Sequence, residues 1–282
     1  MAKLRRLLQG HDGLRDGLCN RLQPLSFGLA ALDSYLPEGG LARGALHEIV
    51  PATQAAFPAA AFGFLVAILA RLSSPSPEAF GKSGAGGTTH PSSSRRGKKP
   101  LLFIMPAYGS AQYDRSSGHL SGHLSGHGLN DLGLDPSHAI LVETAHRKET
   151  LWALVEALRS GAPQAVAGTI DRLDLKTSQK LHLAATDAGL PLLLLRPSQT
   201  LESSAAATRW RVGTAQAARD RFGLYARPRW RLQLERCRNG RPGEWVVEYD
   251  HVTHRFSLVA ALVNPSLSRG AGDQSRREAG RS

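Results

Sequence analysis

Cysteine and long apolar runs are both scarce in this sequence of 282 residues. Its two cysteines, Cys19 and Cys237, cannot build a disulfide framework and favour a reducing compartment. The longest apolar stretch, Ala55–Ala70, is shorter than the roughly 20 residues of a membrane-spanning helix, and Pro58 and Gly63 interrupt it. The N-terminal residues lack the apolar centre of a secretory leader. We therefore expect a cytoplasmic protein with no membrane contact, and association with the nucleoid stays open.

Acidic residues are few relative to basic ones. Lys and Arg number 35 against 23 Asp and Glu, which gives a formal net charge of +12 and a pI near 10.4. Such a balance favours an acidic partner, most often nucleic acid. Basic tails and linkers would hold the same excess without contacting anything, so both interpretations stay open.

Composition changes several times along the chain. A basic, leucine-containing segment comes first, and a pattern of strands and helices follows it. Two polar segments interrupt that pattern; they contain too little apolar surface to offset the entropy of ordering. We therefore divide the chain into an N-terminal basic helix (1–23), a core (24–212) with disordered insertions (73–100 and 114–130), a C-terminal β region (213–265) and a disordered tail (266–282).

Histidine recurs every fourth residue in the repeat SGHLSGHLSGHG at 117–128. On a helix His119, His123 and His127 would share one face, which is the arrangement a metal site needs. Glycine recurs at the same interval and opposes helix formation. We interpret the repeat as an expanded flexible loop and expect no metal there, with metal binding as the alternative.

Apolar strands alternate with amphipathic helices through the core. Strands that are apolar on both faces are typical of a parallel sheet covered by helices on both sides. After residue 207 the pattern changes to period two, and Asn239-Gly240 marks a hairpin turn. The sequence predicts an α/β fold, with a mostly parallel sheet followed by antiparallel strands. The expected core strands are 45–50, 101–105, 139–142, 165–170 and 192–195, and the expected helices are 55–72, 149–159 and 177–188.

A strand, a loop and an apolar helix at 45–72 have the layout of a nucleotide-binding P-loop, but the loop lacks its chemistry. Phosphate binding there needs glycines, a lysine and a Ser/Thr for Mg²⁺. The loop has no glycine or lysine, and its two prolines cannot donate a backbone N–H. We expect no cofactor, no metal and no catalysis; an ATPase with a divergent loop stays the alternative. The degenerate loop consists of Pro51, Ala52, Thr53, Gln54, Ala55, Ala56, Phe57 and Pro58.

Arginine and tryptophan alternate in two C-terminal segments. Arginine pairs with phosphates and tryptophan stacks on bases or fills partner interfaces. An edge strand gives the same alternation, with tryptophan inside and arginine in solvent. Both interpretations stay open. The candidates for partner or DNA binding are Arg209, Trp210, Arg211, Arg227, Arg229, Trp230 and Arg231.

An ordered set of short motifs resembles ImuA-type proteins, RecA-like accessory factors of bacterial damage-induced mutagenesis. The set begins with Phe27-Gly28, Leu32-Asp33 and Gly39-Gly40-Leu41, and reaches the first strand at His47-Glu48-Ile49. The later motifs are RLDL (172–175), SQKLHLAA (178–185), GLPLLLLRP (189–197), ATRWRV (207–212), RPRWRLQL (227–234), NGRPG (239–243) and DHVTHRF (250–256).

The resemblance implies a RecA-like three-layer core and a role in SOS translesion synthesis. We expect a noncatalytic adaptor that binds an ImuB-type polymerase-like protein and an error-prone replicative-type polymerase, with contact to RecA or DNA open. The loop that contacts DNA in RecA-like proteins would span residues 196–207. Two alternatives remain: a nucleotide-dependent DNA-binding ATPase and a basic single-stranded-nucleic-acid-binding protein.

Overall fold

The computed structural model describes residues 23–53, 59–73, 99–107, 125–198, 203–217, 221–224 and 227–262. The predicted N-terminal helix, the C-terminal tail and most of both insertions lie outside these ranges. So do His119 and His123.

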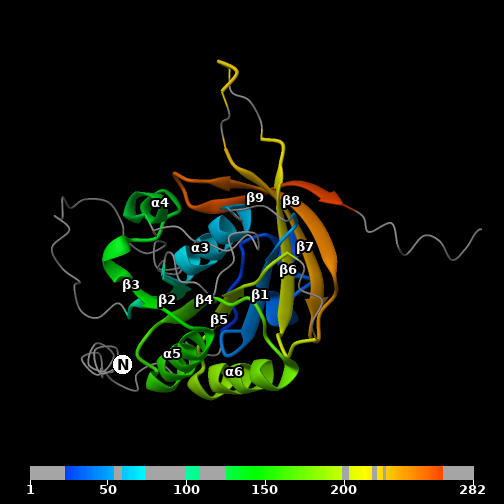
Figure 1. The fold of residues 1–282 in the computed structure, drawn as a ribbon. Coiled ribbons are helices and arrows are strands. Elements are labelled where there is room, and N and C mark those ends of the chain that lie inside the picture. Colours follow the sequence, from blue (N-terminus) through cyan, green and yellow to red (C-terminus); the bar gives the residue numbers. More distant parts are fainter. Residues whose placement is uncertain are drawn as a thin grey trace, which may run out of the picture.

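Nine strands within the described ranges form one sheet in the order β3-β2-β4-β5-β1-β6-β7-β8-β9 (Figure 1). The six strands β1 to β6 pair in parallel, and β7, β8 and β9 continue the sheet in antiparallel fashion. The strands are β1 (Leu46–Pro51), β2 (Leu101–Pro106), β3 (Ala139–Thr144), β4 (Ala165–Thr169), β5 (Leu192–Leu195), β6 (Thr208–Ala215), β7 (Arg229–Cys237), β8 (Gly243–Asp250) and β9 (Arg255–Leu262).

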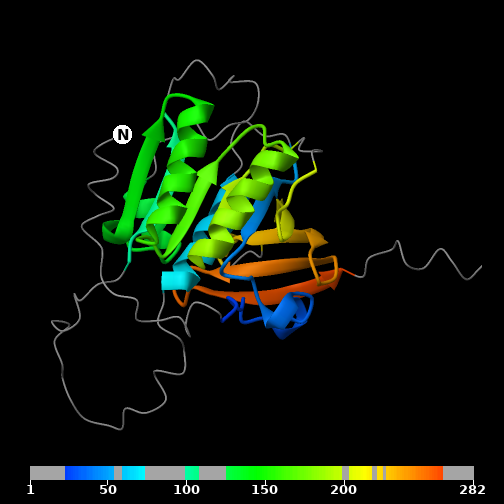
Figure 2. The ribbon, with the colours of Figure 1, turned by 90° about the horizontal axis from the view of Figure 1, so that it is seen from below.

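Helices cover both faces of the parallel part of the sheet. In Figure 1 α3 (Ala59–Ser73) lies above the sheet, and α5 (Arg147–Ser160) and α6 (Leu175–Ala188) lie below it. Figure 2 shows α5 and α6 side by side on their face. This arrangement confirms the predicted fold class, a RecA-like three-layer α/β core followed by antiparallel strands. Within the described ranges no helix is long and apolar enough to cross a membrane.

Helix ends follow local chemistry. The Asp174 carboxylate accepts a hydrogen bond from the Thr177 N–H at 3.1 Å, so α6 begins two residues before the predicted start. Gly189 ends α6 with φ of 62°, a left-handed conformation that favours glycine.

Four short helical elements were not predicted as helices, because glycine or proline lies in or beside each. The end of the histidine repeat, predicted as loop, forms α4 (Gly126–Asp131), which is anchored by the buried side chain of Leu129. The chain turns through α2 (Ala30–Asp33) and a 3₁₀ turn at Pro37–Gly39 before β1. A second 3₁₀ turn at Pro136–His138 precedes β3.

The core above the sheet is aromatic. Strands β6 to β9 curl around α3 and bury their inner face against it (Figure 1). The predicted boundary after residue 212 falls inside β6, and β6 and the later strands contribute to one hydrophobic cluster. The buried aromatic residues of that cluster are Phe27, Phe64, Phe103, Trp210, Trp230, Trp245, Tyr249 and Phe256.

Asp33, part of one quoted motif, holds the turn that leads into this core. Its carboxylate accepts hydrogen bonds from the Phe27 N–H (2.8 Å), the Leu29 N–H (3.0 Å) and the Ser26 hydroxyl (2.7 Å). Gly28 lies inside this turn with φ of 73°, which a side chain would strain.

Replacing Asp33 with alanine should lower the free energy of unfolding by about 2 kcal/mol, because buried backbone donors lose their acceptor. Asp33→Asn keeps one acceptor oxygen and should lose about half as much. Urea unfolding followed by circular dichroism measures both. Equal stability of Asp33→Ala and the wild type would contradict the assigned role.

Candidate functional site

The carboxyl edge of the parallel strands is where open α/β sheets bind ligands. Here β1 ends at Pro51 and leads toward α3, the position of a phosphate loop. Pro51 has no N–H, and the Ala52 N–H donates to the Val212 carbonyl on β6 at 2.8 Å. Thr53 is exposed, and the predicted loop residues 54–58 lie outside the described ranges. The described start of the loop thus directs its first N–H toward the sheet.

The Arg211 side chain holds together three segments near this edge. Its Nη1 donates to the carbonyl of Pro51 at 3.4 Å and to that of Ser198 at 3.2 Å, and its Nε donates to Glu235 on β7. The guanidinium therefore joins the end of β1 to the segment after β5 and to β7, and all three contacts lie within the chain.

A buried ion cluster lies beneath the same edge, on the side of α5 and α6. Glu48, in the middle of β1, is fully buried. Its carboxylate accepts from Arg209 Nε at 2.7 Å, from Arg196 Nη1 at 3.3 Å and from the Ser204 hydroxyl at 3.0 Å. The cluster connects β1 to β6 and to the segment after β5.

The same cluster fixes both ends of the segment predicted as a DNA-contacting loop, 196–207. Arg196 at its start points inward, and its side chain is only 1% exposed. Near its other end the Ser204 carbonyl accepts from Arg236 Nη1 at 2.6 Å. The Arg196 side chain thus pairs with Glu48 in the interior and does not face a phosphate in solvent.

The other candidate arginines, two on β7 and Arg227 just before it, lie opposite carboxylates of β8. Residues that alternate along β7 meet acidic residues that alternate along β8, so charges of opposite sign pair across the strands. These charges are therefore close to balance. The pairs are Arg231 with Glu244 (3.3 Å), Arg229 with Glu248 (2.9 Å), and Arg227 with Glu248 (3.4 Å) and Asp250 (3.0 Å).

Both candidate tryptophans lie in the aromatic core. Trp210 is 0% exposed and Trp230 is 5% exposed. The Trp230 ring stacks on Tyr249, with centroids 5.5 Å apart, and the Trp210 indole N–H donates to the Thr208 hydroxyl at 3.0 Å. The indoles thus lie inside, as the edge-strand interpretation expects, but β6 and β7 are inner strands of the described sheet. Arg209 pairs with the buried Glu48 rather than lying in solvent.

An exposed aromatic that the sequence analysis missed lies in the connection between β6 and β7. Phe222 is 71% exposed and Leu224 is 66% exposed. The Arg221 guanidinium lies over the Phe222 ring, 4.7 Å from its centroid. The sequence signal that could have identified this site is an arginine beside apolar residues, Arg221-Phe222-Gly223-Leu224, within a loop.

Within the described ranges, no three His, Cys, Asp or Glu side chains lie close enough together to hold a metal ion. The carboxylates after β4 instead face a cation, since Arg147 lies 4.0 Å from both Asp171 and Asp174. His127, the one histidine of the repeat that the structure describes, belongs to α4.

His47 on β1 completes a buried hydrogen-bond chain. Its Nδ1 lies 2.8 Å from the Thr208 hydroxyl and its Nε2 lies 2.8 Å from the Ala42 carbonyl. Because that carbonyl only accepts, Nε2 carries the proton and Nδ1 accepts from Thr208. Burial, the main cause, together with the charge of His182 lowers the pKa of His47 to about 4. His47 is therefore neutral in the folded protein near pH 7.

Stability should fall as the pH drops from about 6.5 to about 4. Across this interval the unfolded His47 binds a proton and the folded one does not, so the folded state loses about 3 kcal/mol relative to the unfolded state. Above pH 6.5 the neutral His47 makes its full contribution to the free energy of unfolding. Urea unfolding from pH 7.5 to 4 tests this, with His47→Gln as the variant.

The variant should show a shallower dependence on pH than the wild type. His251→Gln, at an exposed turn position, is the matched control and should leave the slope unchanged. If the wild type and His47→Gln have the same slope, the buried neutral imidazole is not the cause.

Comparison with known proteins gives two curated relatives of high coverage, although no model of a protein family matches the chain. Both are named Protein ImuA and come from Caulobacter vibrioides, one from strain NA1000 / CB15N and one from strain ATCC 19089 / CIP 103742 / CB 15. Each is 30% identical over 273 residues, covering 90% of this chain and 95% of the relative. Identity at this level over nearly the whole of both proteins shows that the chain belongs to the ImuA family.

Proposed function

We propose that this protein is a noncatalytic, RecA-like adaptor of SOS translesion synthesis. It binds an ImuB-type polymerase-like protein and, within the same complex, an error-prone replicative-type polymerase. Membership in the ImuA family supports a role in damage-induced mutagenesis. The observation that carries the noncatalytic part is the start of the loop after β1, where Pro51 has no N–H and the Ala52 N–H bonds to β6.

The rest of that edge supports the same proposal. A working P-loop needs donors aimed at phosphate and a lysine for the β/γ charge. Here the nearby cation, Arg211, contacts the Pro51 and Ser198 carbonyls and Glu235. Contacts within the chain therefore hold the described part of this edge together. This supports an adaptor that works without nucleotide.

The C-terminal strands favour a protein partner over DNA. The arginines predicted to meet phosphate pair with carboxylates, and the tryptophans predicted to stack on bases are buried. A mixed field of paired charges suits the polar rim of a protein interface. Contact with DNA or RecA is then secondary.

The test is direct binding between the purified chain and a purified ImuB-type protein. We expect a complex at micromolar concentrations that survives nuclease and moderate salt. ATP with Mg²⁺ should neither raise the melting temperature nor strengthen the complex. Absence of the complex at tens of micromolar would refute the adaptor function; a saturable thermal shift with ATP would revive the ATPase alternative.

The net charge of +12 keeps single-stranded-nucleic-acid binding as a second candidate. It requires affinity for single-stranded DNA that falls steeply with salt. Binding that dominates at physiological salt, with no complex to the ImuB-type protein, would favour this candidate.

A further inference from the structure

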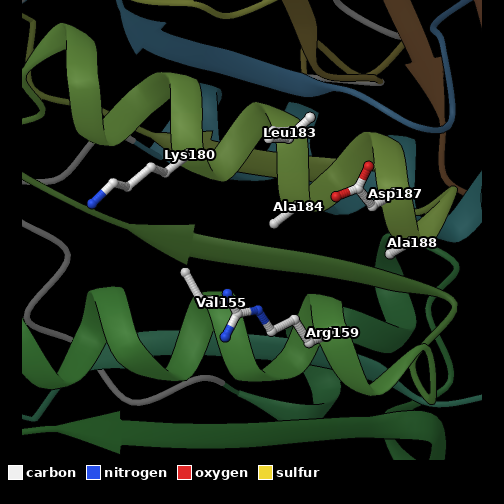
Figure 3. A pocket seen from close by; sticks show the side chains of 7 residues that line it. All are labelled: Val155, Arg159, Lys180, Leu183, Ala184, Asp187 and Ala188. Atoms are coloured by element: carbon white, nitrogen blue, oxygen red, sulfur yellow. The ribbon is translucent and has the colours of Figure 1, made fainter.

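A groove of about 460 Å³ opens between α5 and α6 on the outer face of the molecule (Figure 3). Its two walls are helices of 14 residues each, about 21 Å long at 1.5 Å per residue. The groove is lined by Val155 and Arg159 of α5 and by Lys180, Leu183, Ala184, Asp187 and Ala188 of α6.

The floor of the groove is apolar. Ala184 and Ala188 lie one turn apart on α6, and Val155 faces them from α5 (Figure 3). Leu183 on the α6 wall is 60% exposed, and Leu175, two turns earlier, is 47% exposed. Covering such leucines stabilises a complex by roughly 25 cal/mol per Å² of buried apolar surface.

The rim is basic. Arg159 and Lys180 both lie at the groove, against one acidic residue, Asp187. A partner with acidic residues beside an apolar face would complement both the floor and the rim.

The N- and C-terminal segments of the chain do not have that charge. Residues 1–22 contain five basic and two acidic residues, a net charge of +3, and residues 263–282 contain four basic and two acidic residues, a net charge of +2. A second copy of the chain carries +12. Charge therefore favours a foreign occupant.

We propose that the groove between α5 and α6 binds an acidic amphipathic helix of a partner protein. The inference rests on the adaptor function proposed above and names the surface and the chemistry of the partner. A helix suits the site because two antiparallel or parallel helices present a groove along their length, which a third helix fills with small and apolar side chains spaced three and four residues apart.

The first experiment measures the affinity of an ImuB-type protein for groove variants. Leu183→Glu and the double variant Arg159→Glu/Lys180→Glu should each weaken the complex at least ten-fold. Val252→Glu, at an exposed turn residue, and the double variant Arg221→Glu/Arg241→Glu, at exposed residues outside α5 and α6, are matched controls and should change the affinity less than two-fold. Circular dichroism verifies that every variant folds.

If the wild type forms the complex and the groove variants bind equally well, the groove proposal is overturned and the adaptor function stands. If the wild type forms no complex, the adaptor function fails, and the groove is judged by a second probe.

That probe is a designed 20-residue helical peptide with an Ala/Leu face flanked by glutamates, compared with the same peptide carrying lysines. We expect the acidic peptide to bind the wild type at least ten-fold more tightly than the basic one, and Leu183→Glu to abolish binding. Equal binding of both peptides, or none at 1 mM, overturns the groove proposal. Sedimentation equilibrium covers the remaining occupant: a dimer that Leu183→Glu dissociates would make it a second copy, and this too overturns the proposal.

Discussion

Replacing Glu48 with alanine should lower the free energy of unfolding by about 4 kcal/mol. Removing one member of a buried ion cluster leaves the others without compensation, which costs about 3–5 kcal/mol. Arg196 and Arg209 both contact the Glu48 carboxylate, at 3.3 and 2.7 Å, and Arg196 is as deeply buried as Glu48. Two guanidiniums would thus lose their shared counter-charge in the interior.

Urea unfolding at pH 7 measures this loss. Glu48→Gln keeps the shape and the hydrogen-bond acceptor but removes the charge, so it should be less damaging than Glu48→Ala. Glu244→Gln breaks the more exposed pair with Arg231 and is the matched control; it should cost less than about 1 kcal/mol. A loss at Glu48 no larger than that at Glu244 would show that the cluster contributes little to folding.

The cluster also illustrates what the sequence could not reveal. A glutamate within the apolar strand at 45–50 signals a buried partner, because an unpaired buried charge is costly. Its partners lie 148 and 161 residues away along the chain. They become neighbours only because β1 lies between β5 and β6, and the order of strands in a sheet is not written in the periodicity of any one strand.

The regular elements were predictable for a local reason. Continuous apolar strands and amphipathic helices between 101 and 195 predict a parallel sheet covered by helices. The alternation of apolar and polar residues after residue 207 predicts the antiparallel strands. The structure has both. By contrast, α4 contains two glycines and is held by the tertiary contacts of Leu129, so its local sequence opposed the prediction.

The groove between α5 and α6 could not be predicted from the sequence either. Each helix pattern identifies the face that covers the sheet, but the gap between two helices depends on how they sit on it. The exposed leucines of α6, Leu175 and Leu183, had no assigned role for that reason.

Replacing Trp210 with alanine should also lower the free energy of unfolding by about 4 kcal/mol, since truncating a buried aromatic costs about 3–5 kcal/mol. The ring lies 5.5 Å from Phe27, 5.7 Å from Phe64 and 6.3 Å from Trp245, measured between centroids. Its removal opens a cavity where α3, β6 and β8 meet.

This variant separates a core role from a nucleic-acid role. If Trp210 stacked on a base, Trp210→Ala would weaken binding to single-stranded DNA and leave the melting temperature unchanged. We expect the opposite: a large fall in stability, and unchanged DNA affinity at a temperature where the variant is still folded. Phe222→Ala, at an exposed ring in the connection between β6 and β7, is the matched aromatic control and should change stability by less than about 0.5 kcal/mol. A stable Trp210→Ala protein that has lost DNA binding would contradict both the burial and the adaptor proposal, because the indole would then have to be accessible to a base in solution.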